Sequence, residues 1–69
     1  METMETLRYS VPEMHCGHCK DAVERELAGV AGVAAVQADL DSKVVTVSGR
    51  DLSDEALRDA IAEAGYEVA

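Results

Sequence analysis

The sequence contains no phenylalanine and no tryptophan, and its only aromatic residues are Tyr9 and Tyr66. The apolar residues, 48% of the chain, are therefore mostly small ones such as valine and alanine. A core made of small side chains needs secondary structures that pack closely. A chain of 69 residues has room for one small domain. We therefore expect a single domain over residues 1–69, in which residues 1–5 form a loose start.

Basic residues are scarce as well. Six lysines and arginines stand against fourteen aspartates and glutamates, which gives a formal charge of −8. Nucleic acids and anionic membranes attract clusters of lysine and arginine, so we expect neither as a partner. No apolar run is long enough for direct membrane insertion, and the acidic N-terminus is unlike a secretory signal. These absences favour a cytoplasmic protein, whose charge suits either a basic protein partner or simple solubility.

Cysteine, histidine and proline occur only in residues 12–20, which read Pro-Glu-Met-His-Cys-Gly-His-Cys-Lys. In the cytosol thiols stay reduced. Two cysteines three residues apart in such a protein more often bind metal or take part in redox chemistry than support the structure. The chemistry of the protein is therefore expected in this stretch.

The other segments show strand and helix patterns in turn. Residues 7–11 alternate apolar and polar side chains, as a half-buried strand does, and the proline that follows ends the strand. Apolar residues then recur at helical spacing over residues 18–28. Residues 33–40 and 44–48 are typical of two strands joined by a short polar turn.

A second helix is expected after Ser53, a good N-cap residue. Its apolar stripe comprises Leu57, Ala60, Ile61 and Ala64. Gly65 should close this helix in the left-handed conformation, and residues 66–68 then form a short last strand. The order predicts a ferredoxin-like βαββαβ fold of the α+β class. This is an open-faced sandwich with two helices on one face of a four-stranded antiparallel sheet.

The two thiols, Cys16 and Cys19, lie where the first strand leads into the first helix. Backbone N–H groups at a helix start favour thiolate over thiol, and thiolate is the form that binds metal. Cys19 shares its helical register with Val23 and Leu27, so it should lean toward the core and leave Cys16 more exposed. Two thiolates in a loop suit a soft ion of low coordination number such as Cu(I).

Other chemistries stay open. Zn(II) usually takes four ligands, and the chain has a single Cys-x-x-Cys pair. His15 and His18 are candidate auxiliary ligands, although four donors in one tight loop are hard to place tetrahedrally. A metal-bridged homodimer, or a site for cadmium or mercury, is a further alternative. A thiol–disulfide redox protein is less favoured, because the predicted topology is not that of thioredoxin.

The sequence resembles the heavy-metal-associated (HMA) domain family, most of all its small bacterial copper chaperones of the CopZ and Atx1 type. Residues 14–19, Met-His-Cys-Gly-His-Cys, match the family's Met-x-Cys-x-x-Cys loop. Gly32-Val33 and Ala64-Gly65-Tyr66 also stand where the family has similar residues. The resemblance covers residues 6–68. One departure is Glu13, which stands where the family commonly has glycine.

The resemblance implies that Cys16 and Cys19 are the Cu(I) ligands. It also implies that Met14 is a buried anchor beneath the loop and that Tyr66 lies close to the loop without binding metal. The family carries metal and is not an enzyme. Its copper chaperones hand Cu(I) to a metal-binding domain of a copper-transporting P-type ATPase, through intermediates shared between the thiols of both proteins.

Overall fold

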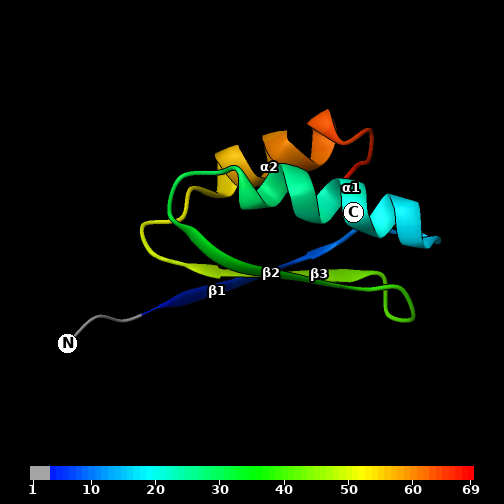
Figure 1. The fold of residues 1–69 in the computed structure, drawn as a ribbon, viewed down its shortest axis with the longest axis horizontal. Coiled ribbons are helices and arrows are strands. Elements are labelled where there is room, and N and C mark those ends of the chain that lie inside the picture. Colours follow the sequence, from blue (N-terminus) through cyan, green and yellow to red (C-terminus); the bar gives the residue numbers. More distant parts are fainter. Residues whose placement is uncertain (1–3) are drawn as a thin grey trace.

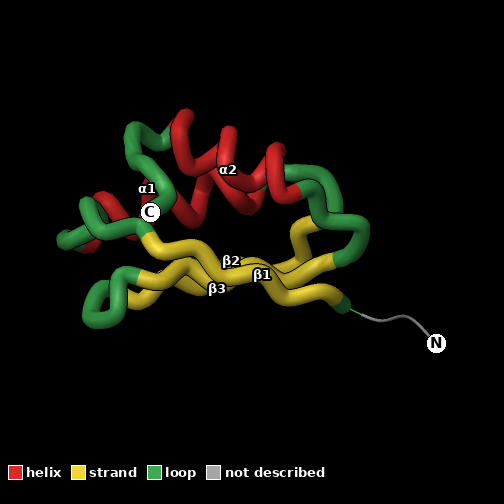
Figure 2. The backbone as a smooth tube through the Cα atoms, turned by 180° about the vertical axis from the view of Figure 1, so that it is seen from behind, coloured by secondary structure: helices red, strands yellow, loops and turns green. Residues whose placement is uncertain are grey.

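The computed structural model describes residues 4–69, which form a sheet and a pair of helices stacked in two layers (Figure 1). The elements in chain order are β1 (Glu5–Ser10), α1 (Gly17–Ala28), β2 (Val33–Asp39), β3 (Val44–Gly49) and α2 (Asp54–Glu63). Both helices cover the same face of the sheet, and no described helix covers the other face (Figure 1, Figure 2). The predicted α+β class, with two helices on one face, is confirmed.

The antiparallel sheet has the strand order β1-β3-β2, so β3 lies at its centre. On one side Tyr9 of β1 lies opposite Val45, and on the other side Ala38 of β2 lies opposite the same valine. The pairing of β2 is irregular between Val33 and Ala35. Val45 is fully buried in the core, beneath the helices.

The fourth strand expected at residues 66–68 is not confirmed. Over residues 4–69 the sheet is 3-stranded, and residues 66–69 have no regular secondary structure. A backbone hydrogen bond of 2.8 Å, from the N–H of Ala69 to the carbonyl of Ser10, joins this segment to the end of β1. Strand pairing requires a ladder of such bonds. The segment therefore lies beside the sheet edge without extending the described sheet.

The beginning of the chain also differs from the prediction. Residues 1–3 lie outside the described part of the chain, but Glu5, expected in the loose start, is the first residue of β1 and lies opposite Gly49. Its carboxylate accepts a hydrogen bond of 2.9 Å from the N–H of Leu52. This contact ties the strand to the loop that precedes α2, so the ordered strand begins earlier than its apolar alternation suggests.

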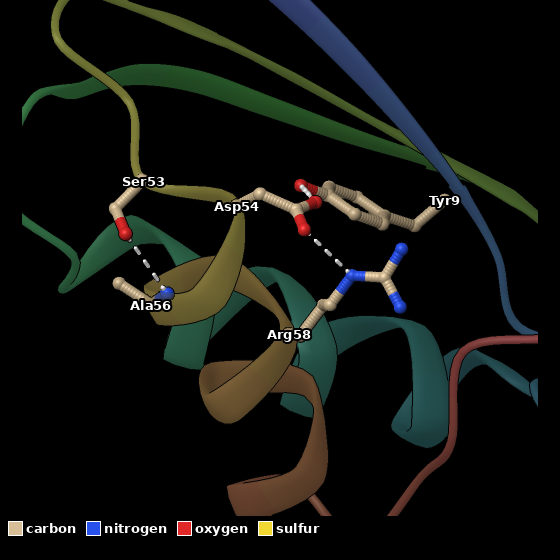
Figure 3. Close-up of polar contacts among 5 residues, drawn as sticks. All are labelled: Tyr9, Ser53, Asp54, Ala56 and Arg58. Carbon is tan, nitrogen blue, oxygen red and sulfur yellow. Dashed lines mark hydrogen bonds and ion pairs between the residues drawn. The ribbon is translucent and has the colours of Figure 1, made fainter.

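Both predicted ends of α2 are confirmed. The Ser53 hydroxyl accepts a hydrogen bond of 3.3 Å from the N–H of Ala56 (Figure 3). Asp54 and Glu55 occupy the first turn, where carboxylates interact favourably with the helix dipole. Beyond the other end, Gly65 has a φ of 95°, a left-handed conformation that glycine adopts at little cost. The chain then turns back toward the sheet (Figure 1).

The core fills the space between the sheet and the helices. Its largest fully buried side chains are Met14, Leu27, Leu57, Ile61, Val11, Val23, Val45 and Val47. Each such side chain contributes roughly 1.5–3 kcal/mol when it leaves water, so apolar burial is the main source of stability. Among the described residues no polar side chain is buried. Within the same residues, neither helix combines the length and the apolar character needed to cross a membrane.

One polar contact joins β1 to the start of α2. The Tyr9 hydroxyl donates to Asp54 Oδ1 at 2.8 Å, and Arg58 Nε donates to Asp54 Oδ2 at 2.9 Å (Figure 3). The Arg58 guanidinium also lies 5.9 Å from the centroid of the Tyr9 ring. Burial, followed by the hydrogen bond with Asp54, raises the pKa of Tyr9 to about 12. The phenol therefore stays protonated and links the two layers.

Candidate metal centre

The segment between β1 and α1 ends at Cys16, and Cys19 follows in the first turn of α1. This start of α1 lies at the end of the molecule away from the start of β1 (Figure 1). Met14, expected beneath the loop, is wholly buried there. Its N–H donates to the carbonyl of Val11 at 3.0 Å, which closes a turn directly after the strand. The segment therefore rests on a side chain that belongs to the core.

The two thiols face each other, with Cys16 Sγ and Cys19 Sγ 2.9 Å apart. Both cysteines are free and partly buried. Helix α1 begins at Gly17, one residue before the predicted start, so that Cys16 is its N-cap residue and Cys19 lies in its first turn. Cys19 also packs against the core, as its helical register predicts. Local helix geometry thus brings the two sulfurs together.

The environment of Cys19 lowers its pKa from 9.0 to about 7. The largest cause is hydrogen bonding with Cys16, followed by hydrogen bonding with Tyr66. The backbone N–H groups of His15 and Cys16 act in the same direction, and partial desolvation opposes them. All these donors favour the charged form of the thiol. Near neutral pH a large share of Cys19 is therefore thiolate, the form that coordinates soft metals.

Tyr66, expected close to the loop, lies beside this pair of sulfurs. Its hydrogen bond with Cys19 is the largest cause that raises the pKa of Tyr66 to about 12. Desolvation and the negative charges of Cys19, Cys16 and Glu13 add to the effect. The phenol therefore remains a neutral donor throughout the pH range in which Cys19 ionises.

The two histidines do not join the sulfurs in one cluster. His15 and His18 are exposed. Within residues 4–69, no three side chains of histidine, cysteine, aspartate or glutamate gather closely enough to hold a metal ion. His15 instead contacts the backbone, with Nδ1 2.7 Å from the carbonyl oxygen of Glu13. In the described structure the site consists of two sulfurs with one phenol beside them.

Two contacts that support the site are absent from the sequence prediction. On α1, the Glu24 carboxylate accepts a hydrogen bond of 3.0 Å from the N–H of Ala38 on β2. The contact between Tyr9 and Asp54 holds the start of α2 in the same way. The first pair is 14 residues apart and the second 45, so no local spacing indicates either contact. The first contact helps to hold α1, which carries Cys19. The second helps to hold α2, which the segment with Tyr66 follows.

The described surface also has a hollow that neither cysteine lines. That hollow has a volume of about 240 Å³ and is open to solvent. It is lined by Lys20, Gln37, Ala38, Asp39, Leu40 and Asp41.

Comparisons with known proteins agree with this geometry. A model of the heavy-metal-associated domain family matches residues 8–67. The chain is similar to the copper chaperone CopZ of Staphylococcus haemolyticus, with 39% identity over 61 residues that cover 86% of this chain and 90% of that protein. It is similar to a solved CopZ metallochaperone, with a TM-score of 0.90, 34% identity and coverage of 94% of this chain and 100% of the other.

A further similar structure is the N-terminal domain of a potential copper-translocating P-type ATPase from Bacillus subtilis, solved in the Cu(I)-loaded state. Its TM-score is 0.86 at 25% identity, with coverage of 96% of this chain and 85% of that domain. The family match spans most of the chain and agrees with the resemblance carried by the Met-x-Cys-x-x-Cys loop. The chain therefore belongs to the heavy-metal-associated domain family.

Proposed function

We propose that this protein is a copper carrier that binds Cu(I) through the thiolates of Cys16 and Cys19. The observation that carries the proposal is the pair of free sulfurs 2.9 Å apart, in which the pKa of Cys19 is lowered to about 7. Cu(I) is soft, prefers thiolate donors and is satisfied by few ligands. The relatives named as copper chaperones support the choice of this metal.

The proposed recipient is the metal-binding domain of a copper-transporting P-type ATPase. Both cysteines are partly exposed, so a thiolate of a second protein can reach an ion held between them. A third sulfur binds before one of the first two leaves, so the ion passes without being released to water. The similarity to an ATPase domain solved with Cu(I) supports a recipient with the same fold. No covalent bond of a substrate changes, so the protein acts as a carrier.

In this proposal, residues 1–69 work as one unit in the cytoplasm. The four-stranded ferredoxin-like sheet is part of it, with residues 66–68 added beside β1. The hydrogen bond between Ala69 and Ser10 supports that placement. Tyr66 lies in the same segment, so the position of the last residues affects the donor that stabilises the Cys19 thiolate.

A second candidate is a carrier, sensor or transporter domain for another soft metal, such as zinc, cadmium or mercury. The observation that favours it is the presence of two exposed histidines in the loop that holds the sulfurs. Ions that take more than two ligands would use them, whereas Cu(I) would not need them.

The test is a titration of the reduced protein with Cu(I) and Zn(II) in competition, in the presence of a Cu(I) chelator. We expect a single Cu(I) per chain to be retained against Zn(II). Cys16→Ser and Cys19→Ser should each lose tight Cu(I) binding and keep the far-UV circular dichroism of the parent, because neither side chain is fully buried. His18→Ala is the matched control and should bind Cu(I) like the parent. A serine variant that holds copper as tightly as the parent would contradict the proposal.

A further inference from the structure

The strand β2 forms an edge of the described sheet. The strand order is β1-β3-β2, so over residues 4–69 β2 pairs with β3 alone. At the opposite edge, the end of the chain lies beside β1, where Ala69 donates a backbone hydrogen bond to Ser10. An edge strand presents N–H and C=O groups to which a further strand can add. The outer side of β2 is therefore the side at which an added strand would pair.

The N–H of Ala38 points out of this edge. Ala38 lies opposite Val45 of β3, but its N–H donates to Glu24 Oε2 of α1 at 3.0 Å. In an antiparallel pair, the residues that exchange no hydrogen bonds with the neighbouring strand recur at every second position. Val36 is two residues earlier in the same register, so its backbone groups also point outward. The Glu24 carboxylate therefore occupies the place that a carbonyl group of an added strand would take.

The sequence at this edge is uncharged. Residues 27–38 contain no aspartate, glutamate, lysine or arginine, and they are the longest such run in the chain. They include all of β2 (Val33–Asp39) except its last residue, and most of their side chains are alanine or valine. Uncharged segments of this kind add to one another as strands unless a charged group protects the edge. At β2 a side chain of α1, Glu24, supplies that charged group.

We propose that the outer edge of β2 is a strand-addition site for a second copy of this chain, and that Glu24 keeps the site closed. Two chains that each carry a formal charge of −8 repel one another, and the uncharged residues 33–38 are where they can meet. About a two-fold axis, Val36 of one copy pairs with Ala38 of the other, which places the two Gln37 side chains opposite each other. The site makes no use of the two sulfurs, so it is separate from the proposed copper function.

Amide hydrogen exchange of the reduced, metal-free protein, followed by NMR at a concentration at which it is monomeric, tests the role of Glu24. Glu24→Ala should speed exchange of the Ala38 N–H by about tenfold or more, because a hydrogen bond to a charged group is lost. Glu24→Gln keeps a side-chain oxygen that can accept this bond and should preserve most of the protection. Fast exchange at Ala38 in the parent, or unchanged exchange in Glu24→Ala, would overturn the proposal.

Sedimentation velocity with reductant and chelator tests the addition of a second copy, because neither a disulfide nor a metal can then join two chains. Glu24→Ala should form dimers as its concentration rises, whereas the parent and Glu24→Gln should stay monomeric. The matched control is Glu26→Ala, which removes the same charge from an exposed position of α1 and should also stay monomeric. Glu24 is not fully buried, so its loss should leave the far-UV circular dichroism unchanged. A Glu24→Ala variant that stays monomeric would contradict the proposal.

A second substitution locates the contact between the two copies. Gln37→Glu, added to Glu24→Ala, puts two carboxylates directly opposite each other across the paired strands and should restore the monomer. Ala62→Glu, added instead, gives the same net charge at an exposed position of α2 and should leave the dimer intact. If the Gln37→Glu double variant still dimerises, or if both double variants are monomeric, the two copies do not pair through β2 and the proposal fails.

Discussion

The two tyrosines of the chain lie near opposite ends of α2, and their hydroxyl groups have the same raised pKa, about 12, for different reasons. Burial is the largest cause for Tyr9, and the Asp54 carboxylate comes second. For Tyr66 the largest cause is hydrogen bonding with Cys19. One phenol is held by a carboxylate at the start of α2, and the other by a thiol whose own pKa is lowered to about 7.

The partner therefore decides what each phenol does. Tyr9 is 5% exposed and joins the sheet to the start of α2, so it supports the fold. Tyr66 is only partly buried and stabilises a thiolate, so it affects the chemistry of the loop. Residue type and pKa do not distinguish the two, whereas their contacts do. The following predictions test this difference.

Tyr66 can act on the thiols only if the core holds the loop beside Tyr66 as firmly as it holds β1. Met14 is the residue that connects the loop to the core, and it is wholly buried. Replacing it with alanine should lower the free energy of unfolding by about 2–5 kcal/mol, measured by urea denaturation. Met4, which is 50% exposed, is the matched control, and Met4→Ala should have little effect. Equal effects of the two substitutions would show that the loop does not depend on the core.

The two phenols should differ in their contribution to stability. Tyr9→Phe removes the hydrogen bond to Asp54 and should lower the free energy of unfolding by about 1 kcal/mol. Tyr66→Phe should have a smaller effect, because Tyr66 lies at the edge of the core. Urea denaturation of both variants at pH 7 measures the difference. A larger loss for Tyr66→Phe would reverse the roles that we assign.

Stability at alkaline pH should depend on Tyr9. Its pKa is about 12 in the folded protein against an ordinary value of 10.0. The fold favours the protonated phenol, so this contribution is complete below pH 10 and is lost as the pH rises from 10 through 12. The Tyr9→Phe variant should lack the part of the alkaline loss of stability that ionisation of Tyr9 causes. Urea denaturation at several pH values measures the free energy of unfolding of both proteins. An unchanged alkaline profile in this variant would contradict the prediction.

Only Tyr66 should affect the reactivity of the thiols. Because its hydrogen bonding lowers the pKa of Cys19, Tyr66→Phe should raise that pKa from about 7 toward 9.0. Alkylation of the metal-free protein by iodoacetamide as a function of pH measures the shift. The matched control is Tyr9→Phe, whose alkylation profile should equal that of the parent. A profile that moves equally in both variants would remove the distinction between the two tyrosines.

The smallest effect is expected at the exposed side of the Tyr9 contact. Arg58 and Asp54 form an ion pair between side chains that are 57% and 61% exposed. Such a pair contributes about 0.5 kcal/mol, so Arg58→Ala should change the free energy of unfolding by about this amount, and less at high salt. A loss larger than that of Tyr9→Phe would mean that the arginine, and not the phenol, holds Asp54.

Much of the fold could be predicted from local patterns. The Ser53 cap and the left-handed Gly65 depend on a few neighbouring residues, and both are present in the structure. The fourth strand depends on how the short segment at residues 66–68 meets the edge of β1, and periodicity does not indicate this. The link from Tyr9 to Asp54 joins residues 45 positions apart, so it becomes visible only in three dimensions.

For the site, spacing indicated which residues meet but not how they interact. The interval between Cys16 and Cys19 predicts two sulfurs near a helix start, and the structure places them 2.9 Å apart. The family resemblance, and no spacing rule, indicated Tyr66. That the phenol lowers the pKa of Cys19 depends on the turn at Gly65, which brings the end of the chain back to the loop.

The burial of Met14, two positions before the first thiol, also has a consequence for the metal-free protein. Its side chain is fully buried in the apolar core, so the core anchors the segment above it without help from a metal. In zinc fingers, metal binding and folding are one equilibrium, and departure of the ion unfolds the domain. On the proposed function, the metal-free molecule keeps its fold, and release of Cu(I) only has to break bonds to sulfur.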